Sequence, residues 1–356
     1  MKKSALFLLI AIYSYCATAQ NTVIIGRVVD STTKAVLAGA SAFCPNTTYG
    51  SVSNADGLFF MRLPAGGYDL AVSYTGYERK IYRIGANQTA ADTLLVELSK
   101  QEKVMEEVAV VGSNEVPDGW NKYGKFFMEN FIGTSPNASL CTVKNPEALR
   151  FFYNKKRNRL KVTGKEDIII NNYGLGYTIR YQLDSFSYEY NTNVSQFTGF
   201  PFFAEMDTSV EVRTQFIKNR ARTYLGSRLH FMRSFYNSVV NDEGFIVEVL
   251  TGNSQNTELV TDLYNEEQYA LDSGEVIVGW KGKYRISYKN VYPNKTFLEE
   301  YKLPANSRYQ PTILDISDGF VIERNGYFYD QYDVVNFGYW AWKKLAETLP
   351  YDYVYQ

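Results

Sequence analysis

The stretch that organises the chain is Asp207–Val240, which reads DTSVEVRTQFIKNRARTYLGSRLHFMRSFYNSVV. Helical periodicity, dense positive charge and the single histidine coincide here, and residues 209–240 carry six basic side chains against one acidic side chain. Gly226 suits the position that follows a helix, and Ser227 suits an N-cap. The stretch therefore predicts two helices broken at Gly226-Ser227.

The second predicted helix has an apolar side and a polar side. At about 100° of rotation per residue, one arc holds the apolar residues Leu229, Phe231, Met232, Phe235, Tyr236, Val239 and Val240. The opposite arc holds a polar ridge, defined as His230, Arg233, Ser234 and Asn237 together with Arg228 near the helix start. These five residues are the candidate binding site for an anionic group. The alternative, which we expect, is a structural face where Arg233 meets an internal carboxylate and His230 donates to the backbone.

Strand-like runs lie on both sides of the helical pair. The runs that precede it are 149–153, 159–162, 167–171, 177–183 and 186–190, and those that follow are 244–250, 276–279, 283–289, 310–316 and 319–323. The first group predicts an antiparallel meander. Helices are predicted at 121–132 and at 339–347. Residues 121–356 are therefore predicted to form an α+β domain of unknown function, an antiparallel-sheet domain with an inserted helical pair.

Residues 20–98 contain seven short strand-like runs separated by turns. One turn, Asn54-Ala55-Asp56-Gly57, predicts a hairpin because its glycine occupies the place that requires a positive φ. Seven short strands in so few residues favour a β-sandwich. The whole chain is thus expected to be mainly β, with a sandwich in front of the α+β domain.

Five blocks of this front region carry a resemblance. They are Gly26-Arg27-Val28-Val29-Asp30, Leu37-Ala38-Gly39-Ala40, Asp56-Gly57-Leu58-Phe59, Leu63-Pro64-Ala65-Gly66-Gly67-Tyr68-Asp69-Leu70 and Gly76-Tyr77. The region resembles the carboxypeptidase regulatory-like domain. The resemblance implies a prealbumin-like β-sandwich and an accessory role, because such domains accompany enzymes, surface proteins and outer-membrane importers alike.

Two further resemblances concern the rest of the chain. The predicted linker is residues 99–120. Its part 99–111, with Gln101-Glu102-Lys103 and then Glu107-Val108-Ala109-Val110-Val111, is similar to the segment that joins this sandwich to the plug of TonB-dependent transporters. Blocks such as Phe131-Ile132-Gly133-Thr134-Ser135 and Leu349-Pro350-Tyr351-Asp352-Tyr353 resemble the C-terminal region of uncharacterised bacterial envelope proteins that carry the sandwich. This last resemblance implies an architecture and no activity.

Residues 1–19 have the three parts of a secretory signal peptide. Lys2 and Lys3 precede an apolar run, Ala5–Ile12, and Ala17-Thr18-Ala19 precedes the expected cleavage before Gln20. A lipid-modified Cys16 is the alternative. The protein is therefore expected to be exported, to the periplasm, the outer membrane or the cell surface. No later stretch reaches the ~18 apolar residues of a membrane helix, so no transmembrane helix is expected.

The composition bears on which partners the protein can bind and on whether it contains a disulfide. A net charge of −1 with a pI of 6.1 gives no general attraction to nucleic acid. Thirty tyrosines and 22 phenylalanines suit a strand-rich exported protein, and they are also compatible with a glycan-binding surface. Cys44 and Cys141 remain after signal removal, either as a disulfide or as two buried thiols.

The inventory of reactive residues argues against most enzyme classes. A zinc carboxypeptidase site needs two histidines and a glutamate, and a single histidine excludes it. No cofactor or metal motif is present, and Cys141 with His230 is the thiol–imidazole pair that the inventory favours. We therefore expect a non-enzymatic structural or interaction protein of the cell envelope, whose partner is another envelope protein or a glycan. The alternatives are a glycan-binding or outer-membrane uptake accessory, and a hydrolase with a non-standard site involving His230.

Overall fold

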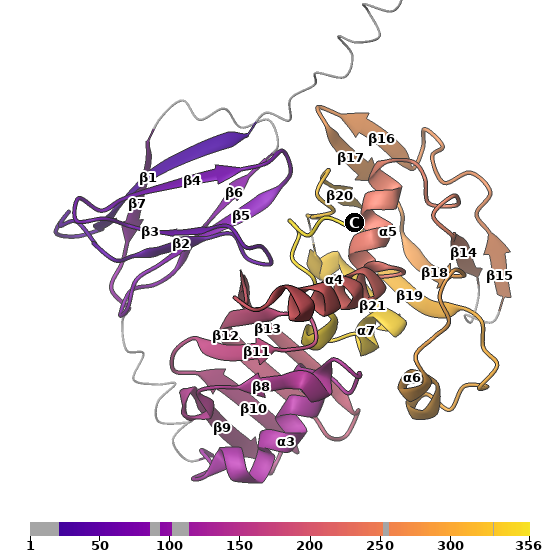
Figure 1. Ribbon diagram of the computed structural model, residues 1–356, viewed down its shortest axis with the longest axis horizontal. Coiled ribbons are helices and arrows are strands. Elements are labelled where there is room, and N and C mark those ends of the chain that lie inside the picture. Colours follow the sequence, from indigo (N-terminus) through magenta and orange to yellow (C-terminus); the bar gives the residue numbers. More distant parts are fainter. Residues whose placement is uncertain (1–20, 86–92, 102–113, 252–255, 330) are drawn as a thin grey trace, which may run out of the picture.

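A computed structural model describes residues 21–85, 93–101, 114–251, 256–329 and 331–356 (Figure 1). The predicted signal peptide, Cys16 and most of the predicted linker lie outside the described residues. The described chain forms a front sandwich, a first back part built on one sheet and a second back part built on two sheets. Figure 1 shows these three parts arranged around the C-terminal end of the chain.

The front part is the predicted seven-stranded sandwich. Its strands are β1 (Thr22–Asp30), β2 (Ser41–Phe43), β3 (Gly50–Val52), β4 (Leu58–Leu63), β5 (Tyr68–Ser73), β6 (Lys80–Ile84) and β7 (Leu94–Leu98). They form a three-stranded sheet, β4-β1-β7, and a four-stranded sheet, β3-β2-β5-β6. Alternate residues of β4 (Phe59, Met61 and Leu63) point into the shared core, as a half-buried strand requires.

The turn at Asn54-Ala55-Asp56-Gly57 is real, but the prediction of a hairpin is wrong. The strand before the turn pairs with β2, and the strand after it pairs with β1, so the turn joins the two sheets. Asn54 Oδ1 accepts hydrogen bonds from the Asp56 and Leu58 N–H groups, at 3.0 and 2.9 Å. Gly57 adopts φ +73°, which glycine allows without strain. The residues of the turn therefore predicted that the chain turns here, but they could not predict which strands pair.

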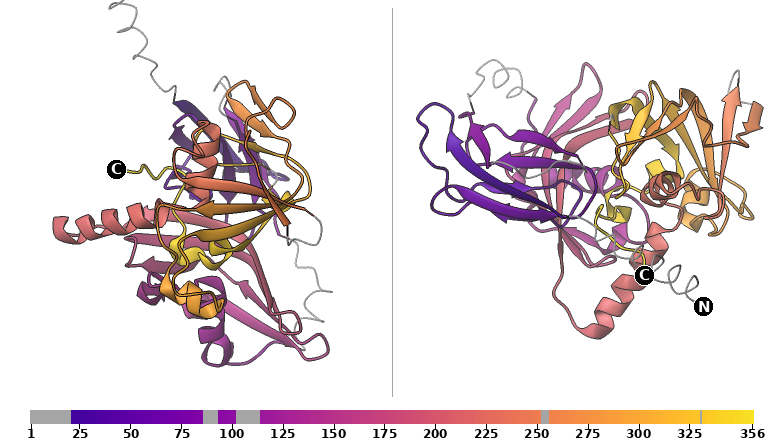
Figure 2. Two further views of the ribbon diagram at one scale, coloured as in Figure 1. Left: turned by 90° about the vertical axis from the view of Figure 1, so that its right-hand side faces the viewer. Right: turned by 90° about the horizontal axis from the view of Figure 1, so that it is seen from above.

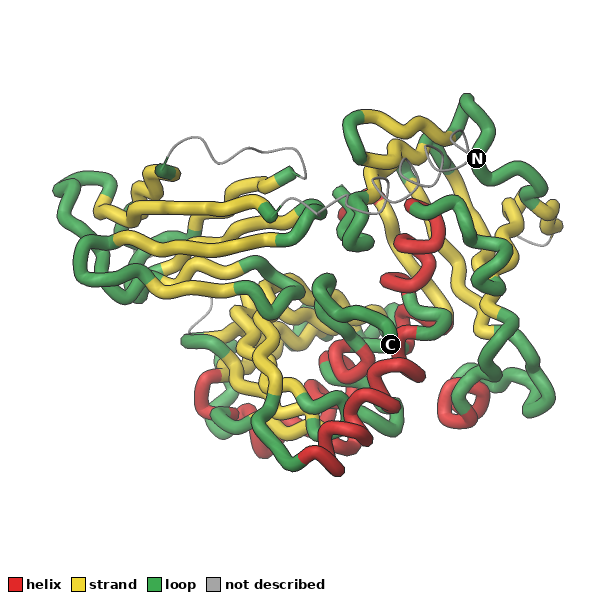
Figure 3. The backbone as a smooth tube through the Cα atoms, turned by 45° about the horizontal axis from the view of Figure 1, so that its top comes forward, coloured by secondary structure: helices red, strands yellow, loops and turns green. Residues whose placement is uncertain are grey.

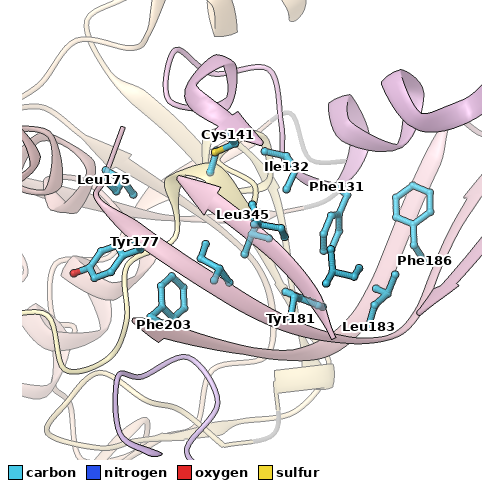
Figure 4. Packing of buried hydrophobic residues seen from close by; sticks show 14 of the residues in the cluster. Phe131, Ile132, Cys141, Leu175, Tyr177, Tyr181, Leu183, Phe186, Phe203 and Leu345 are labelled. Atoms are coloured by element: carbon cyan, nitrogen blue, oxygen red, sulfur yellow. The ribbon is translucent and has the colours of Figure 1, made fainter. Parts of the chain in front are cut away.

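The first back sheet is antiparallel and is covered by α3 (Gly119–Phe131). Its strands are β8 (Cys141–Val143), β9 (Leu149–Asn154), β10 (Arg159–Gly164), β11 (Ile168–Asn172), β12 (Tyr177–Glu189) and β13 (Val194–Glu205), with 3₁₀ turns η1 (Ala138–Leu140) and η2 (Pro146–Ala148). Phe127 of α3 makes an edge-to-face contact with Phe186. Phe131 of the same helix makes an edge-to-face contact with Tyr181 (Figure 4). These contacts bury the helix against the sheet.

The order of this sheet, β8-β11-β12-β10-β9, corrects the predicted meander. β12 pairs with both β11 and β10 along one edge because it is long enough to span the two strands. Residues 177–181 pair with β11, and residues 186–189 pair with β10. A register irregularity between Leu183 and Ser185 separates the two halves, while β13 runs along the other side of the whole strand.

The helical pair breaks where predicted, but its second helix ends at Tyr236, before the predicted helical positions Val239 and Val240. α4 (Val210–Tyr224) is followed by α5 (Arg228–Tyr236), Gly226 adopts φ +71°, and the Ser227 Oγ accepts a hydrogen bond from the His230 N–H at 3.1 Å. The prediction of two helices broken at Gly226-Ser227 is confirmed. The N-terminal end of α4 extends away from the rest of the molecule (Figure 2).

The second back part combines two sheets. A five-stranded sheet has the order β15-β14-β18-β19-β21, and a three-stranded sheet has the order β16-β17-β20. The elements are β14 (Phe245–Thr251), β15 (Asn256–Leu259), β16 (Tyr269–Asp272), β17 (Glu275–Val278), β18 (Gly282–Tyr288), α6 (Lys295–Glu300), β19 (Gln310–Ile316), β20 (Phe320–Ile322), η3 (Gln331–Asp333) and β21 (Val334–Gly338). Phe231 and Phe235 of α5 lie in the core of this part.

The predicted C-terminal helix, 339–347, is longer than the helix that the structure shows. The chain forms only α7 (Tyr339–Trp342) and the 3₁₀ turn η4 (Leu345–Glu347). The break lets Trp340 pack in the second core while Leu345 and Ala346 pack in the first.

Both described cysteines are free and buried. Cys44 lies in the sandwich core, and Cys141 belongs to the core of the first back sheet, which also contains Ile132 and Leu175 (Figure 4). The sequence left open a disulfide or two buried thiols, and the structure has the two buried thiols.

Candidate functional site

The short side chains of the predicted ridge bond within their own helix. Ser234 Oγ donates to the His230 carbonyl at 2.8 Å, and Asn237 Nδ2 donates to the Arg233 carbonyl at 2.9 Å. Arg228 lies with its guanidinium carbon 5.2 Å from the centre of the Phe328 ring. None of these contacts draws the three side chains together around a common point.

His230 is buried, and both of its ring nitrogens are engaged. Nδ1 accepts a hydrogen bond from the Gly226 N–H at 3.1 Å, so the neutral ring carries its proton on Nε2. Nε2 lies 3.1 Å from Glu243 Oε2 and donates to it. Burial lowers the pKa of His230 below its ordinary value, although the Glu243 carboxylate opposes the shift. The expectation that His230 donates to the backbone is therefore wrong, since its backbone partner is a donor and its acceptor is a carboxylate.

Arg233 uses its guanidinium to hold three backbone carbonyls. Nε donates to Asn325 at 3.0 Å, and the two terminal nitrogens donate to Tyr353 and Tyr351, each at 2.8 Å. The expected internal carboxylate is absent from these described contacts, so this part of the structural interpretation is also wrong. Arg233 fixes the C-terminal segment, defined as residues 350–356, to α5.

The C-terminal segment also bonds to the sandwich. The Tyr351 N–H donates to the Asn46 carbonyl at 2.7 Å. The Asp352 carboxylate accepts hydrogen bonds from the N–H of Thr48, at 2.9 Å, and from the Thr48 hydroxyl. Figure 3 shows the C-terminus beside the helices. The segment therefore links the helical pair to the loop that follows β2.

The sandwich contacts the first back sheet directly as well. The Asn46 N–H donates to the Pro201 carbonyl at 2.7 Å, and Thr47 forms a parallel β-bridge with Phe202. Arg79 bonds to Gln182 at 2.8 Å, forms a 2.6 Å ion pair with Asp184, and lies over the Phe200 ring at 3.8 Å. Backbone and side-chain contacts thus fix the sandwich against β12 and β13.

A third contact joins the sandwich to the turn after β20. Asn325 Nδ2 donates to the Gly67 carbonyl at 2.9 Å, and Tyr327 Oη donates to Asp69 Oδ2 at 2.8 Å. Arg83 adds a 3.2 Å hydrogen bond to Tyr327 Oη. A Cβ at Gly67 would lie 2.4 Å from Glu323 Cγ, so the two parts approach too closely for any other residue there. The sandwich therefore meets both back parts and the C-terminal segment.

Two cavities lie on either side of the C-terminal segment. The first, about 290 Å³, is lined by Thr48, Tyr177, Glu205, Arg213, Ile217, Arg220, Pro350, Asp352, Tyr353, Val354 and Gln356. Arg220 is held within it by a 2.7 Å ion pair with Glu205, by the carbonyls of Leu175 and Gly176, and by the Tyr177 ring at 3.9 Å. Two arginines and two carboxylates balance the charge of this lining.

The second cavity, about 370 Å³, is lined by Pro64, Ala65, Tyr224, Arg233, Arg324, Asn325, Tyr353, Val354 and Tyr355. Its lining contains three tyrosines and two arginines and no carboxylate. Cavities of this size between domains, with a few convergent polar groups, are the usual form of small-ligand sites. The second cavity, called the tyrosine cavity below, is the candidate functional site.

Of the residues that line the tyrosine cavity, Arg233 was predicted from the sequence as a candidate and the others were not. Its lining comes from the β4–β5 turn, the end of α4, the turn after β20 and the C-terminal segment, which are far apart in the chain. The signal that was available is the tyrosine-rich end of the sequence, Tyr351-Asp352-Tyr353-Val354-Tyr355. Only folding brings it beside Arg233.

The structure gives no thiol–imidazole site in the described residues. Cys141 Sγ lies 3.4 Å from the Asn137 carbonyl, and burial raises the pKa of this thiol to about 12, so it stays protonated at neutral pH. The His230 ring instead contacts Tyr224, Phe245 and Tyr288. Across the same part of the chain, no three His, Cys, Asp or Glu side chains gather closely enough to hold a metal ion.

Comparison with known proteins identifies the front part. Residues 24–110 match the CarboxypepD_reg-like domain, which agrees with the resemblance seen in the sequence. None of the curated proteins is similar to the chain. No helix in the described part of the chain has both the length and the apolar character needed to cross a bilayer.

Two solved structures show weak similarity. One is the Bacillus anthracis TIE protein, with a TM-score of 0.20 and 12% identity over 53% of this chain and 32% of that chain. The other is a Bacteroides fragilis protein described as membrane-associated and of unknown function, with a TM-score of 0.19 and 12% identity over 89% of this chain and 99% of that chain. Neither TM-score indicates a shared overall fold.

Proposed function

We propose that this chain, which carries a CarboxypepD_reg-like domain at residues 24–110, is an exported, non-enzymatic protein of the cell envelope that binds another envelope protein. The support for export is the pattern of residues 1–19, with its basic start, apolar run and small residues before Gln20. The support for binding comes from the surface that the docked sandwich leaves uncovered.

That surface is the outer face of the sheet β4-β1-β7. Four of its large apolar side chains are exposed, Ile25, Leu58, Phe60 and Leu95, and the last two are 49% and 56% exposed. Ile25 lies directly opposite Phe60, while Leu58 and Leu95 both lie opposite Arg27. The four side chains therefore form one patch, called the outer-sheet patch.

The outer-sheet patch is unusual for a sheet of this kind. An antiparallel strand pair with one face in the core normally presents polar residues to water on the other face. Contiguous exposed apolar residues with a polar rim mark interaction surfaces. Arg62 borders the patch, and Arg27 lies within it, between Leu58 and Leu95. Neither arginine forms an ion pair within the described residues, whereas Glu97 is paired with Lys34 at 2.6 Å. The partner surface that fits is apolar and carries acidic groups that face these two arginines.

The test is co-purification from envelope membranes with a matched pair of variants. Phe60→Ser removes the centre of the patch, and Phe337→Ser removes a phenylalanine of equal exposure, 50%, from β21. We expect one or more envelope proteins to be recovered with the unaltered protein and with Phe337→Ser, and to be lost with Phe60→Ser. Equal recovery with both variants would remove the outer-sheet patch as the binding surface.

A glycan-binding or uptake accessory is the second candidate, and the tyrosine cavity is the observation that favours it. Aromatic side chains combine a broad apolar face with a polar tip, which suits a ligand that has both characters. This role is compatible with the first, because the cavity and the outer-sheet patch involve different residues.

The hydrolase alternative gains no support from the geometry of His230. A general base must reach the proton that it removes, and its reactive nitrogen must be available. Nδ1 of His230 is occupied by the Gly226 N–H, and Nε2 faces Glu243. The measurement that bears on this alternative is hydrolysis of peptide, ester or glycan substrates by the mature protein and by its His230→Ala variant.

A further inference from the structure

We propose that the tyrosine cavity binds an anionic glycan, with a sugar ring stacked on Tyr355 and an acidic group held by Arg324. This inference rests on the second candidate role, and it is independent of the outer-sheet patch. It is carried by three features of the cavity: a half-exposed ring stacked on a buried one, a guanidinium with no ion pair among the described residues, and the absence of carboxylates from the lining.

The ring of Tyr355 is stacked on another ring and stays partly exposed. It stacks on Tyr224 with 5.1 Å between ring centres and 21° between planes. Tyr224 is itself buried and packs on His230, with ring centres 4.7 Å apart. Because Tyr224 and His230 belong to the packed helical corner, they fix the orientation of Tyr355, which remains 47% exposed. Because the ring is already oriented, little conformational entropy is lost when a ligand stacks on it.

The positive charge of the cavity comes from two arginines whose hydrogen bonding differs. Arg233 donates hydrogen bonds to three backbone carbonyls. Arg324 is exposed and forms no ion pair or hydrogen bond within the described residues. A guanidinium presents a planar fork of donors that matches a carboxylate or a phosphate. With no acidic side chain in the lining, the cavity therefore favours an anionic ligand.

The polar tips of the tyrosines favour a sugar over an apolar acid. The hydroxyls of Tyr353 and Tyr355 form no hydrogen bond to any described residue, so they are available to a ligand. Each can donate and accept, which matches the hydroxyl groups of a sugar ring. The cavity thus offers a ring face, two free hydroxyls and a cation to one ligand.

The test is calorimetric titration of the mature protein with a galacturonic acid hexamer, and with a neutral hexamer of glucose as comparison. We expect the acidic hexamer to bind and the neutral one to bind at least about tenfold more weakly, a difference that one charged contact supplies. Arg324→Ala and Tyr355→Ala should each weaken binding of the acidic hexamer by about tenfold. Tyr355→Phe keeps the ring and should stay closer to the unaltered protein than Tyr355→Ala does.

Arg308 and Tyr309 provide the matched controls, because both are exposed and neither lines the tyrosine cavity. Arg308→Ala and Tyr309→Ala should leave the affinity unchanged. Equal affinity for the two hexamers, no binding of the acidic hexamer, or equal losses in the control variants would each overturn the inference. Co-purification through the outer-sheet patch would still be intact in those cases, so the two proposals fail separately.

Discussion

Arg233 illustrates how a cation on a polar helix face can serve the fold. Its three carbonyl partners lie 92, 118 and 120 residues away in the chain. The spacing of His230, Arg233, Ser234 and Asn237 predicted one polar ridge, of which the first three lie in α5 and Asn237 is its C-cap. The spacing could not identify their partners, because those partners are backbone groups of distant segments.

Replacing Arg233 tests this role. Arg233→Ala leaves three carbonyls without their donor, and hydrogen bonds to charged groups contribute more than neutral ones. We expect the free energy of unfolding to fall by about 2 kcal/mol or more. Urea denaturation measures it, and Arg308→Ala, an exposed arginine without described partners, should change it by less than about 0.5 kcal/mol. Equal effects of the two substitutions would contradict the assignment.

His230 gives the protein a pH dependence that can be measured cleanly, since the chain has no other histidine. Its folded-state pKa is lowered by burial, whereas an unfolded histidine has a pKa of about 6.5. Between these two values the unfolded state binds more protons, so stability is lost as the pH falls below about 6.5. The slope is limited to about 1.4 kcal/mol per pH unit for one proton.

The measurement is the free energy of unfolding at several pH values from 7.5 down to about 5, above the usual range of exposed carboxylates. We expect stability to decrease with falling pH in the unaltered protein and to change less in His230→Gln. A stability that rises as the pH falls through this window would mean that His230 is charged in the folded protein.

The corner between α4 and α5 is the element that the sequence predicted best. A glycine after a helix, a serine cap and an apolar arc all act within a few residues, so local physics decides them. The sandwich was predictable for a related reason, since alternation and turn residues act locally. The pairing of β12 with both β11 and β10, and the break after Trp342, depend on packing between distant segments and could not be predicted locally.

Gly226 is needed at the corner for two reasons that can be separated. It has φ +71°, and a Cβ there would lie 2.4 Å from Gln310 Oε1 and 2.5 Å from Tyr288 Cδ1. Gly274 has φ +89° with nothing within 4 Å of the same position. We expect Gly274→Ala to cost about 1 kcal/mol from backbone strain alone, and Gly226→Ala to cost at least about 1 kcal/mol more. Thermal denaturation of both variants compares the two costs, and similar losses would show that the crowding at Gly226 is relieved.

The candidate cavities illustrate the limit of prediction at the scale of elements. Each is lined by the C-terminal segment together with residues from other elements. The sequence showed tyrosines near its end and arginines in the helical pair, but no periodicity connects those segments. The tyrosine cavity forms only because the sandwich and the helical pair both contact the C-terminal segment.

The maturation of the whole molecule can be checked by mass. If residues 1–19 are a cleaved signal peptide, the protein recovered from the envelope should begin at Gln20. A lipid-modified protein would instead begin at Cys16 and carry the added mass of acyl chains. Intact-protein mass spectrometry separates these outcomes, and recovery of a chain that begins at Met1 would contradict export by this route.

Both proposed binding surfaces, the outer-sheet patch and the tyrosine cavity, depend on the sandwich being fixed to the back of the molecule. Backbone bonds at Asn46, the Arg79 contacts and the Asn325–Gly67 bond join it to the back parts. The bonds of Asp352 to Thr48 join it to the C-terminal segment. A fixed sandwich presents the outer-sheet patch in one direction and closes one wall of the tyrosine cavity. A sandwich that moves freely would do neither.

The most direct test is a pulsed electron resonance distance measurement between spin labels on Val52→Cys in the sandwich and Leu259→Cys in β15. Both positions are 61% exposed, and the two native cysteines in the described chain are buried away from the label. We predict one narrow distance distribution in the intact protein and a broader one after deletion of residues 350–356. A broad distribution in the intact protein would contradict the account.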